Sequence, residues 1–162
     1  MILRHALAIL ALPVTVTIVV PAYILASTKQ FAPPNFFQIV FAAPFFGIGL
    51  VLFYKTVSLF ATIGQGTLAP WDPTRKLVIR GIYRHVRNPM ISGVLAILLG
   101  EAILFGSLAL FVWFVVFFIM NAIYLPLSEE PGLERRFGND YLEYQKNVPR
   151  WIPRLDAWNA EK

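Results

Sequence analysis

Long apolar runs separated by short polar segments dominate the hydrophobic pattern of this chain. The runs cover about residues 6–26, 36–63, 90–104 and 108–127. Each predicts a membrane-spanning helix, because crossing a bilayer takes roughly 20 apolar residues. The third run is short for a full crossing, and Phe105-Gly106-Ser107 is the expected turn after it. The pattern therefore predicts an all-α integral membrane protein with about four transmembrane helices.

The composition agrees with this pattern. Of the 162 residues, 57% are hydrophobic and 14% are charged, whereas soluble proteins average about 25% charged residues. We expect one domain, residues 1–162, with a cytosolic tail at 128–162. The first run could instead be a secretory signal peptide, but it is long for one and further spans follow it directly.

The distribution of basic residues predicts the orientation of the spans. Lysines and arginines gather in residues 64–89 and in the tail, while the turn at 105–107 has none and the 27–35 loop has only Lys29. Short cytoplasmic loops carry the excess of basic residues, so we expect both termini in the cytoplasm. The small size and the lack of a sorting signal favour a bacterial inner membrane.

Composition also narrows the chemistry. The chain has no cysteine, which excludes disulfides, thiolate metal sites and cysteine nucleophiles. His5 and His85 are the two histidines, and no spacing of His, Asp and Glu resembles a metal site. The net charge of +5 is attributed to loops that face anionic lipid rather than to nucleic-acid binding. We therefore expect neither a metal nor a nucleic acid as a partner.

A basic cluster precedes the predicted hairpin of residues 90–127. Asn88 suits the N-cap of the third span, and Pro89 suits its first turn. A helix start presents free backbone N–H groups that bind anions. Arg87 lies beside this start and could form a forked contact with a carboxylate. This end of the hairpin is therefore a candidate anion site.

An acidic pair, Glu129 and Glu130, follows the hairpin and is expected on the same side of the membrane. One interpretation is a solvated helix start, where acids complement the helix dipole. The other is a ligand site opposite Arg87, because carboxylates near a membrane are costly unless paired or hydrated. Helical neighbours point about 100° apart, so we expect one of them, Glu130, to face a ligand. Glu101, near the far turn, is a weaker candidate.

The tail contains an expected amphipathic helix at residues 129–146. Its apolar stripe, at spacings of four, four and three, consists of Leu133, Phe137, Tyr141 and Tyr144. The helix could lie on the membrane surface or form a lid over the charged site, and the two interpretations are compatible. Residues 148–153 contain two prolines that end the helix, and Trp151 suits the membrane interface.

Taken in order, these motifs resemble one family, the membrane methyltransferases that include isoprenylcysteine carboxyl methyltransferase and the phospholipid N-methyltransferases. The motifs are Gly81-x-Tyr83-x3-Arg87-Asn88-Pro89-Met90, Glu129-Glu130-Pro131-x-Leu133, Phe137-Gly138-x2-Tyr141-x2-Tyr144 and Val148-Pro149-Arg150. The resemblance covers about residues 64–154. Gly47-x-Gly49 also resembles a G-x-G motif of phosphatidylethanolamine methyltransferases.

The resemblance implies S-adenosylmethionine as cofactor, in a pocket at the cytosolic membrane face that the tail closes and that lipid enters laterally. Carried over by motif, the pocket residues are Tyr83, Arg87, Asn88, Pro89, Glu129 and Glu130. Gly93, one turn into the third span, is a further candidate, either for close helix packing or for backbone approach to a cofactor. Membrane lipids and a lipid or small apolar methyl acceptor are the implied partners.

Two departures from the family pattern bear on the substrate. The family usually has His where Asn88 stands, and often Tyr where Ile91 stands. Prenylcysteine enzymes carry an arginine ahead of the acidic pair, whereas residues 112–128 contain no Arg or Lys. This favours an amine or thiol acceptor over a prenylcysteine carboxylate.

Methyl transfer from an activated donor mainly needs donor and acceptor to be positioned. We expect Arg87 and the helix start to hold the cofactor carboxylate and Glu129 to hold its amino group. Glu130 is the expected catalytic residue, which accepts a proton from an amine acceptor. Glu130→Ala is then expected to abolish turnover and leave the fold intact.

Two other functions compete with methyl transfer. The first is a non-catalytic membrane protein that retains the fold. The second is a nicotinamide-dependent membrane reductase, whose cofactor phosphates would need several cations. The candidates are Arg75, Lys76, Arg80, Arg84 and Arg87.

Overall fold

The computed structural model describes residues 10–29, 31–64 and 76–159, and every regular element in these ranges is helical. The elements are η1 (Leu10–Val19), α2 (Val20–Thr28), α3 (Phe36–Leu59), η2 (Phe60–Gly64), η3 (Gly81–Arg84), α4 (Pro89–Phe105), α5 (Leu108–Tyr124), η4 (Leu125–Glu129), α6 (Glu130–Phe137) and α7 (Asn139–Asn147). Elements η1, η2 and η4 are π-helical, and η3 is a 3-10 turn. The expected all-helical fold is thus confirmed for the described residues.

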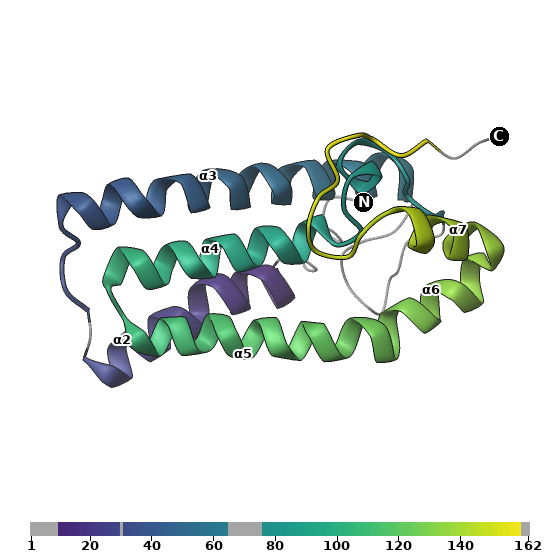
Figure 1. Ribbon diagram of the computed structural model, residues 1–162. Helices are drawn as coiled ribbons and strands as arrows, with labels where there is room; N and C mark the ends of the chain where they lie inside the picture. The colour runs from purple at the N-terminus through teal and green to yellow at the C-terminus, as the bar shows by residue number, and fades with distance from the viewer. Residues whose placement is uncertain (1–9, 30, 65–75, 160–162) are drawn as a thin grey trace.

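Four apolar helical segments coincide with the four apolar runs. Two of them, Phe36–Ile63 and Leu108–Phe137, are long and apolar enough to cross a membrane, while Pro13–Thr28 and Pro89–Phe105 are shorter. Residues 6–9 of the first run lie outside the described ranges. The helices run side by side as a bundle, with α6 and α7 at one end (Figure 1).

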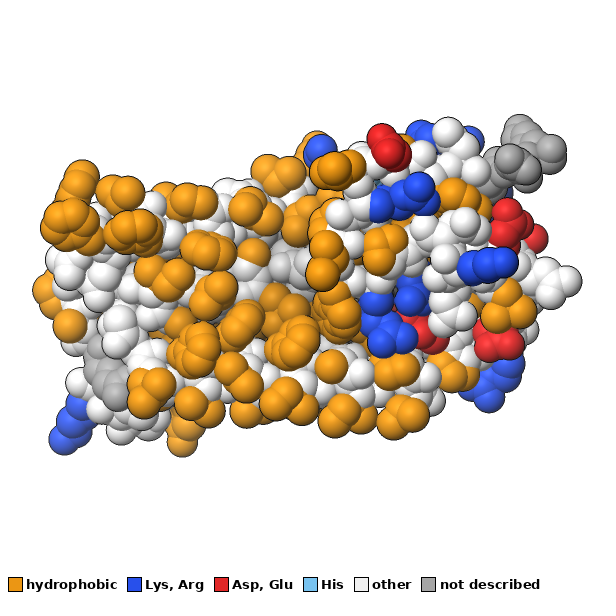
Figure 2. Space-filling view, viewed as in Figure 1, with side chains coloured by type: hydrophobic (Ala, Val, Ile, Leu, Met, Phe, Trp, Pro, Cys, Tyr) orange, Lys and Arg blue, Asp and Glu red, His pale blue; other side chains and the backbone are white. Residues whose placement is uncertain are grey.

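The surface is divided in the way a membrane protein requires. Hydrophobic side chains cover the length of the bundle, and charged side chains gather at the end that carries α6 and α7 (Figure 2). On α3, for example, Phe36 and Phe41 are 74% and 65% exposed. An apolar surface of this extent needs an apolar surrounding, which supports membrane association.

Two glycines let α3 and α4 approach closely. A Cβ added at Gly49 would lie 2.7 Å from the carbonyl oxygen of Gly93, and one added at Gly93 would lie 3.0 Å from the carbonyl oxygen of Gly49. Small residues permit this kind of contact between membrane helices. Helix packing therefore accounts for Gly93, and its place in a cofactor site stays a prediction. Gly47 has nothing within 4 Å of an added Cβ.

The turn between α4 and α5 lies at residues 105–107, as the sequence predicts. Gly106 ends α4 with a φ of 57°, a left-handed conformation that favours glycine. Ser107 begins α5, and its Oγ accepts a hydrogen bond of 3.3 Å from the Leu110 amide. This tight turn makes α4 and α5 antiparallel and returns the chain to the charged end.

The tail differs from the single helix expected at residues 129–146. Gly138 has a φ of 56° and separates α6 from α7. The predicted stripe is nevertheless brought together, because Tyr141 and Tyr144 are buried with Val148 and pack against the side chains of Leu77, Ile79, Leu133, Phe137 and Trp158. The stripe thus faces the protein itself, which agrees with the lid interpretation and not with a helix that lies on the membrane through this face.

Candidate functional site

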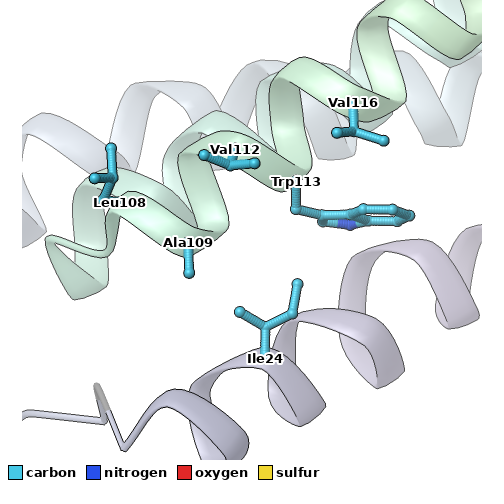
Figure 3. Close-up of a pocket in the computed structure, with 6 residues that line it drawn as sticks. All are labelled: Ile24, Leu108, Ala109, Val112, Trp113 and Val116. Atoms are coloured by element: carbon cyan, nitrogen blue, oxygen red, sulfur yellow. The ribbon is translucent and has the colours of Figure 1, made fainter.

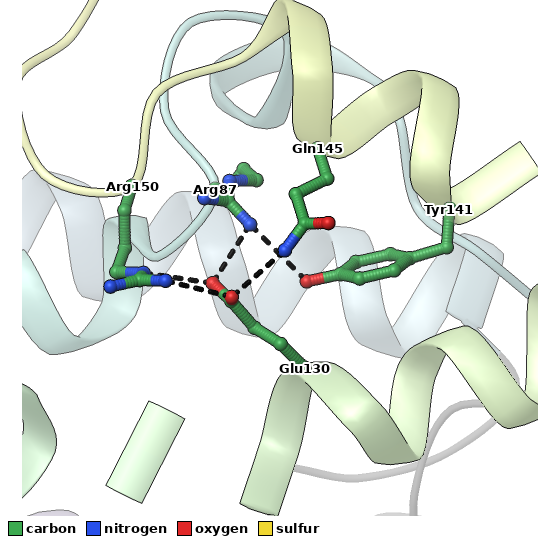
Figure 4. Close-up of polar contacts among 5 residues, drawn as sticks. All are labelled: Arg87, Glu130, Tyr141, Gln145 and Arg150. Carbon is green, nitrogen blue, oxygen red and sulfur yellow. Dashed lines mark hydrogen bonds and ion pairs between the residues drawn. The ribbon is translucent and has the colours of Figure 1, made fainter. Parts of the chain in front are cut away.

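The α4–α5 hairpin brings the two ends of the predicted cluster into contact. Arg87 precedes α4, and Glu130 begins α6, 43 residues later. Arg87 Nη1 donates a 2.8 Å hydrogen bond to Glu130 Oε1 (Figure 4). The two side chains are only 9% and 8% exposed, so this is a buried ion pair. A buried charge is tolerated when it is paired and hydrogen-bonded.

Two tail residues complete the coordination of Glu130. Arg150 donates from Nε to Oε1 and from Nη2 to Oε2, both at 2.8 Å, and Gln145 Nε2 donates to Oε2 at 2.9 Å. All of these donors converge on one carboxylate (Figure 4). Sequence reasoning missed both residues as site members. The one available signal was the Val148-Pro149-Arg150 motif, which includes Arg150 without giving it a partner.

The electrostatics of Glu130 follow from these partners. Burial acts to raise its pKa, but the hydrogen bonds from Arg150 and the charges of Arg87 and Arg150 outweigh burial and hold the pKa below the ordinary 4.5. Glu130 is therefore a well-stabilised carboxylate. Such a group binds cations strongly but accepts a proton poorly near neutral pH.

Glu129 has the opposite electrostatic character. It is the last residue of η4 and is half-buried. Burial raises its pKa above 4.5, and the neighbouring charge of Glu130 raises it further, while Arg136 acts in the opposite direction. Neighbouring carboxylates whose pKa values are pushed apart are a common basis for different acid–base roles.

Tyr83 supports the cluster from η3. Tyr83 is 7% exposed, and its ring stacks on Phe60, with centroids 5.7 Å apart and planes 18° apart. Its carbonyl oxygen accepts a 2.7 Å hydrogen bond from the Tyr144 hydroxyl. Tyr141 lies closer to the ion pair, and its hydroxyl accepts a 3.3 Å hydrogen bond from Arg87 Nη1. The tyrosines of α7 thus tie the tail to the residues that precede α4.

The start of α4 is placed as the sequence predicts, with one difference. Pro89 is in the first turn, and Asn88 occupies the N-cap position, but the Asn88 side chain makes no capping hydrogen bond. Instead, the Asn88 carbonyl oxygen accepts hydrogen bonds from the Ser92 amide and hydroxyl, both at 3.1 Å. Pro89 fixes the helical φ here, so the helix begins without the side-chain cap.

After α7, residues 149–158 form a segment that we call the C-terminal strap. The Arg87 amide donates to the Pro149 carbonyl oxygen at 2.9 Å, and the Arg154 amide donates to the His85 carbonyl oxygen at 3.0 Å. Arg84 Nε donates to the Trp158 carbonyl oxygen at 2.8 Å. The strap therefore lies along residues 84–87 and occupies Arg84, one of the cations that a nicotinamide cofactor would need.

One hydrogen-bond donor of the cluster is buried without a partner among the described residues. Arg87 Nε is buried and has no hydrogen-bond partner within the residues that the structure describes. A buried unpaired donor is unusual and calls for a ligand or another explanation. Together with Glu129, the half-buried neighbour of Glu130 in sequence, the cluster offers an unpaired cationic donor and an acid. These two groups suit a zwitterion that carries both a carboxylate and an ammonium.

Glu101, the weaker candidate from the sequence, lies at a distance from this cluster. Glu101 is 12 residues into α4 from Pro89, which is about 18 Å along a helix, and the structure does not bring it to the cluster.

An apolar groove of about 500 Å³ lies between α2 and α5 near the 105–107 turn (Figure 3). It is lined by Ile24, Leu108, Ala109, Val112, Trp113 and Val116. This lining has no titratable group, so the groove offers no chemistry of its own.

Comparison with known proteins identifies a family to which this chain is similar. A sequence model of the family described as phospholipid methyltransferase matches residues 37–140. The matched segment begins in α3, includes Arg87, Glu129 and Glu130, and ends at the start of α7. Searches of curated proteins and of solved structures found no match.

Proposed function

Because this chain belongs to the phospholipid methyltransferase family, we propose that it transfers methyl groups from S-adenosylmethionine to a lipid or small apolar acceptor at the cytosolic membrane face. The observation that carries the proposal is the meeting of Arg87 with Glu130, beside Glu129, at the charged end of an apolar bundle. A charged cofactor and a membrane-embedded acceptor would meet at such a boundary.

The residues present fit the cofactor. Its amino-acid part carries a carboxylate and an ammonium, and the unpaired Nε of Arg87 and the half-buried Glu129 offer complementary groups. Arg87 and the start of α4 at Pro89 would hold the carboxylate, and the acidic pair of Glu129 and Glu130 would attract the ammonium. Tyr83 and Asn88 would line the same side. When bound, S-adenosylmethionine supplies an electrophilic methyl group on a sulfonium.

The acid–base roles are assigned from the environments of the two glutamates. Sequence reasoning favoured Glu130 as the proton acceptor, but its ion pairs with Arg87 and Arg150 lower its pKa and weaken it as a base. A catalytic base works best with a pKa near the operating pH. We therefore assign proton transfer from an amine acceptor to Glu129, whose pKa is raised. Glu130 would position the two arginines.

The kind of methyl acceptor is proposed from the lack of basic residues in the segment that leads into the acidic pair. Residues 112–128, which lead into the acidic pair, contain no Arg or Lys that could hold a substrate carboxylate. The polar Asn121 in this segment is buried and donates to its own helix, from Nδ2 to the Phe117 carbonyl oxygen at 2.8 Å. An amine or thiol acceptor therefore fits better than a prenylcysteine carboxylate.

The membrane arrangement completes the proposal. Four spans would place the cluster, residues 76–89 and the tail on one side, and the 105–107 turn on the other. The basic residues of the cluster side favour the cytoplasm, with both termini there and a bacterial inner membrane as the location. The fourth span would end near Leu127, before the first charged residues of the long apolar helix.

The two competing functions fit less well. For a nicotinamide-dependent reductase, Arg84 would be needed for the cofactor phosphates, yet Arg84 is bonded to the strap. Arg75, another of the proposed cations, lies outside the described residues. A non-catalytic protein would use the Glu130 cluster only to hold the tail, and it is distinguished from an enzyme by turnover.

The experiment is a methyl-transfer assay in lipid nanodiscs with S-adenosylmethionine labelled in its methyl group. Nanodiscs with and without an amine-bearing phospholipid, and others with an apolar thiol, would be compared. We expect label in an amine or thiol acceptor, a large loss in Glu129→Gln, and little change in Glu134→Gln, an exposed α6 residue that serves as control. No transfer to any acceptor by folded wild-type protein would contradict the proposal.

A further inference from the structure

The C-terminal strap is ordered, yet it exposes large apolar side chains. Ile152 is 80% exposed and Leu155 is 97% exposed. The backbone on either side of them is fixed, because the Pro149 carbonyl oxygen, the Arg154 amide and the Trp158 amide are all hydrogen-bonded to the segment that precedes α4. Large aliphatic side chains gathered on a fixed backbone suit an apolar partner outside the chain.

An aromatic contact shows how far along the helix axes the strap lies. The ring of Trp151 packs against Phe118 of α5, with centroids 5.5 Å apart and planes 52° apart. Phe118 is six residues before the end of α5 at Tyr124, which corresponds to about 9 Å along the helix axis. Phe118 is itself 40% exposed on the surface of the bundle. Trp151 therefore reaches the apolar, membrane-facing part of the protein.

The neighbours of Trp151 share that level. The Cα atom of Ile152 is about 3.8 Å from that of Trp151, so its exposed side chain begins at nearly the same level along the bundle. The sequence Arg150-Trp151-Ile152-Pro153-Arg154-Leu155 alternates basic residues with aromatic and aliphatic ones. This combination is typical of segments that lie at the boundary of headgroups and acyl chains.

We propose that the C-terminal strap docks on the bilayer, with Trp151, Ile152 and Leu155 inserted at the headgroup–acyl boundary, and that this docking keeps Arg150 on Glu130. The lipid-contacting part of the tail is thus the strap, and not the stripe of α6 and α7, which the protein buries. Arg150 directly precedes Trp151, so any movement of the strap away from the membrane would pull on the ion pair.

The proposal does not depend on catalysis. It requires only that the bundle spans a bilayer, and it connects the membrane to the buried carboxylate through covalently adjacent residues. Loss of the membrane around the strap would loosen the contact between Arg150 and Glu130 even in a protein with no methyltransferase activity. The test below therefore measures the position of the strap and not turnover.

Site-directed spin labelling tests the docking directly, because the chain has no cysteine. Ile152→Cys, Leu155→Cys and the control Asp156→Cys would be labelled singly in nanodiscs that contain anionic phospholipid. All three positions are exposed, so the labels need not disturb packing. We expect labels at 152 and 155 to collide more with oxygen than with a water-soluble nickel complex, and the label at 156 to show the reverse. Equal access of the nickel complex to all three labels would overturn the proposal.

A protease assay tests the second part, that docking keeps Arg150 in place. Trypsin cuts after Arg150 and Arg154 only when the strap leaves its site. We expect Ile152→Glu with Leu155→Glu to increase cleavage there at least several-fold in nanodiscs, while Asp156→Asn leaves the rate unchanged. An unchanged rate in the double variant, with its helical content intact, would overturn the link between docking and the ion pair.

Discussion

Arg150 donates two hydrogen bonds of 2.8 Å to Glu130, one from Nε to Oε1 and one from Nη2 to Oε2. Such a forked contact fixes both distance and orientation. Because Arg87 binds the same carboxylate, Glu130 joins three parts of the chain: the segment before α4, the start of α6 and the C-terminal strap. The carboxylate is therefore the structural centre of the charged end as well as a member of the proposed site.

Removal of Arg150 is expected to destabilise the charged end. In Arg150→Ala the buried Glu130 loses two of its hydrogen bonds, and we expect a loss of about 1–3 kcal/mol in the free energy of unfolding. Arg150→Lys should lose less, because it keeps the charge but not the fork. Denaturant unfolding in detergent micelles measures both. Arg135→Ala, on the exposed side of α6, is the control, and equal effects of Arg135→Ala and Arg150→Ala would contradict this account.

The stability that Glu130 contributes should depend on pH. Its pKa in the folded protein lies below the ordinary 4.5, so its contribution is fully present above pH 4.5 and is lost as the pH falls below that value. We expect Glu130→Gln to be less stable than wild type by about 1–3 kcal/mol at pH 7. This would differ from the sequence-based expectation of an intact fold. Unfolding curves between pH 3 and pH 7 measure the difference, which should shrink at the acid end; a constant difference would argue against an ionised, paired Glu130.

Glu129 should behave in the opposite way. Its pKa in the folded protein is raised, so the folded state holds a proton more tightly than the unfolded state, and stability falls as the pH rises above 4.5. Glu129→Gln removes this cost, and we expect it to unfold at a higher temperature than wild type at pH 7. If Glu129 accepts a proton in turnover, the same variant should lose activity on the order of 10²-fold or more. A variant that is both less stable and fully active would exclude this role.

The packing of α3 on α4 provides a matched pair of variants. A Cβ at Gly49 would lie 2.7 Å from the carbonyl oxygen of Gly93, whereas a Cβ at Gly47 meets nothing within 4 Å. Gly49→Ala must push the helices apart, and we expect it to cost about 1–3 kcal/mol. Gly47→Ala should be neutral or slightly stabilising, since alanine favours a helix over glycine. Thermal unfolding of the two purified variants, side by side, distinguishes these outcomes.

Much of the fold was predictable because it depends on local signals. The apolar runs gave the helices, Gly106 and Ser107 gave the turn between α4 and α5, and Pro89 gave the start of α4. The resemblance to membrane methyltransferases is confirmed by the family match. Each of these depends on residues close in sequence, or on an ordered set of motifs that the chain carries intact.

The tail was predicted less well, because its structure depends on contacts with distant residues. The helix expected at 129–146 is broken where Gly138 adopts a positive φ. A single glycine within a periodic apolar pattern does not by itself predict such a break. The stripe that contains Tyr141 and Tyr144 was correct, but periodicity cannot say whether an apolar face meets lipid or protein. Here residues 77–79, far away in sequence, cover it.

The candidate site was also predicted only in part, because some of its contacts depend on residues that are distant in sequence. Pairing of Arg87 with the acidic pair followed from the hairpin, since both ends of two antiparallel spans lie on one side of the membrane. The contacts of Gln145 and Arg150 with Glu130 did not follow, because the path of the chain after α7 is set by backbone bonds to residues 84–87. The set of cofactor-binding residues therefore stays a prediction.

Binding of S-adenosylmethionine to the purified protein in lipid nanodiscs, measured by calorimetry, decides whether this chain is a methyltransferase of the proposed kind. We expect saturable binding by wild type, a strong loss in Arg87→Gln, and no loss in the exposed-surface control Arg135→Gln. Absence of binding by wild-type protein that is shown to be folded, in detergent as well as in nanodiscs, would contradict the methyltransferase assignment and leave a membrane protein that uses the Glu130 cluster only to hold its tail.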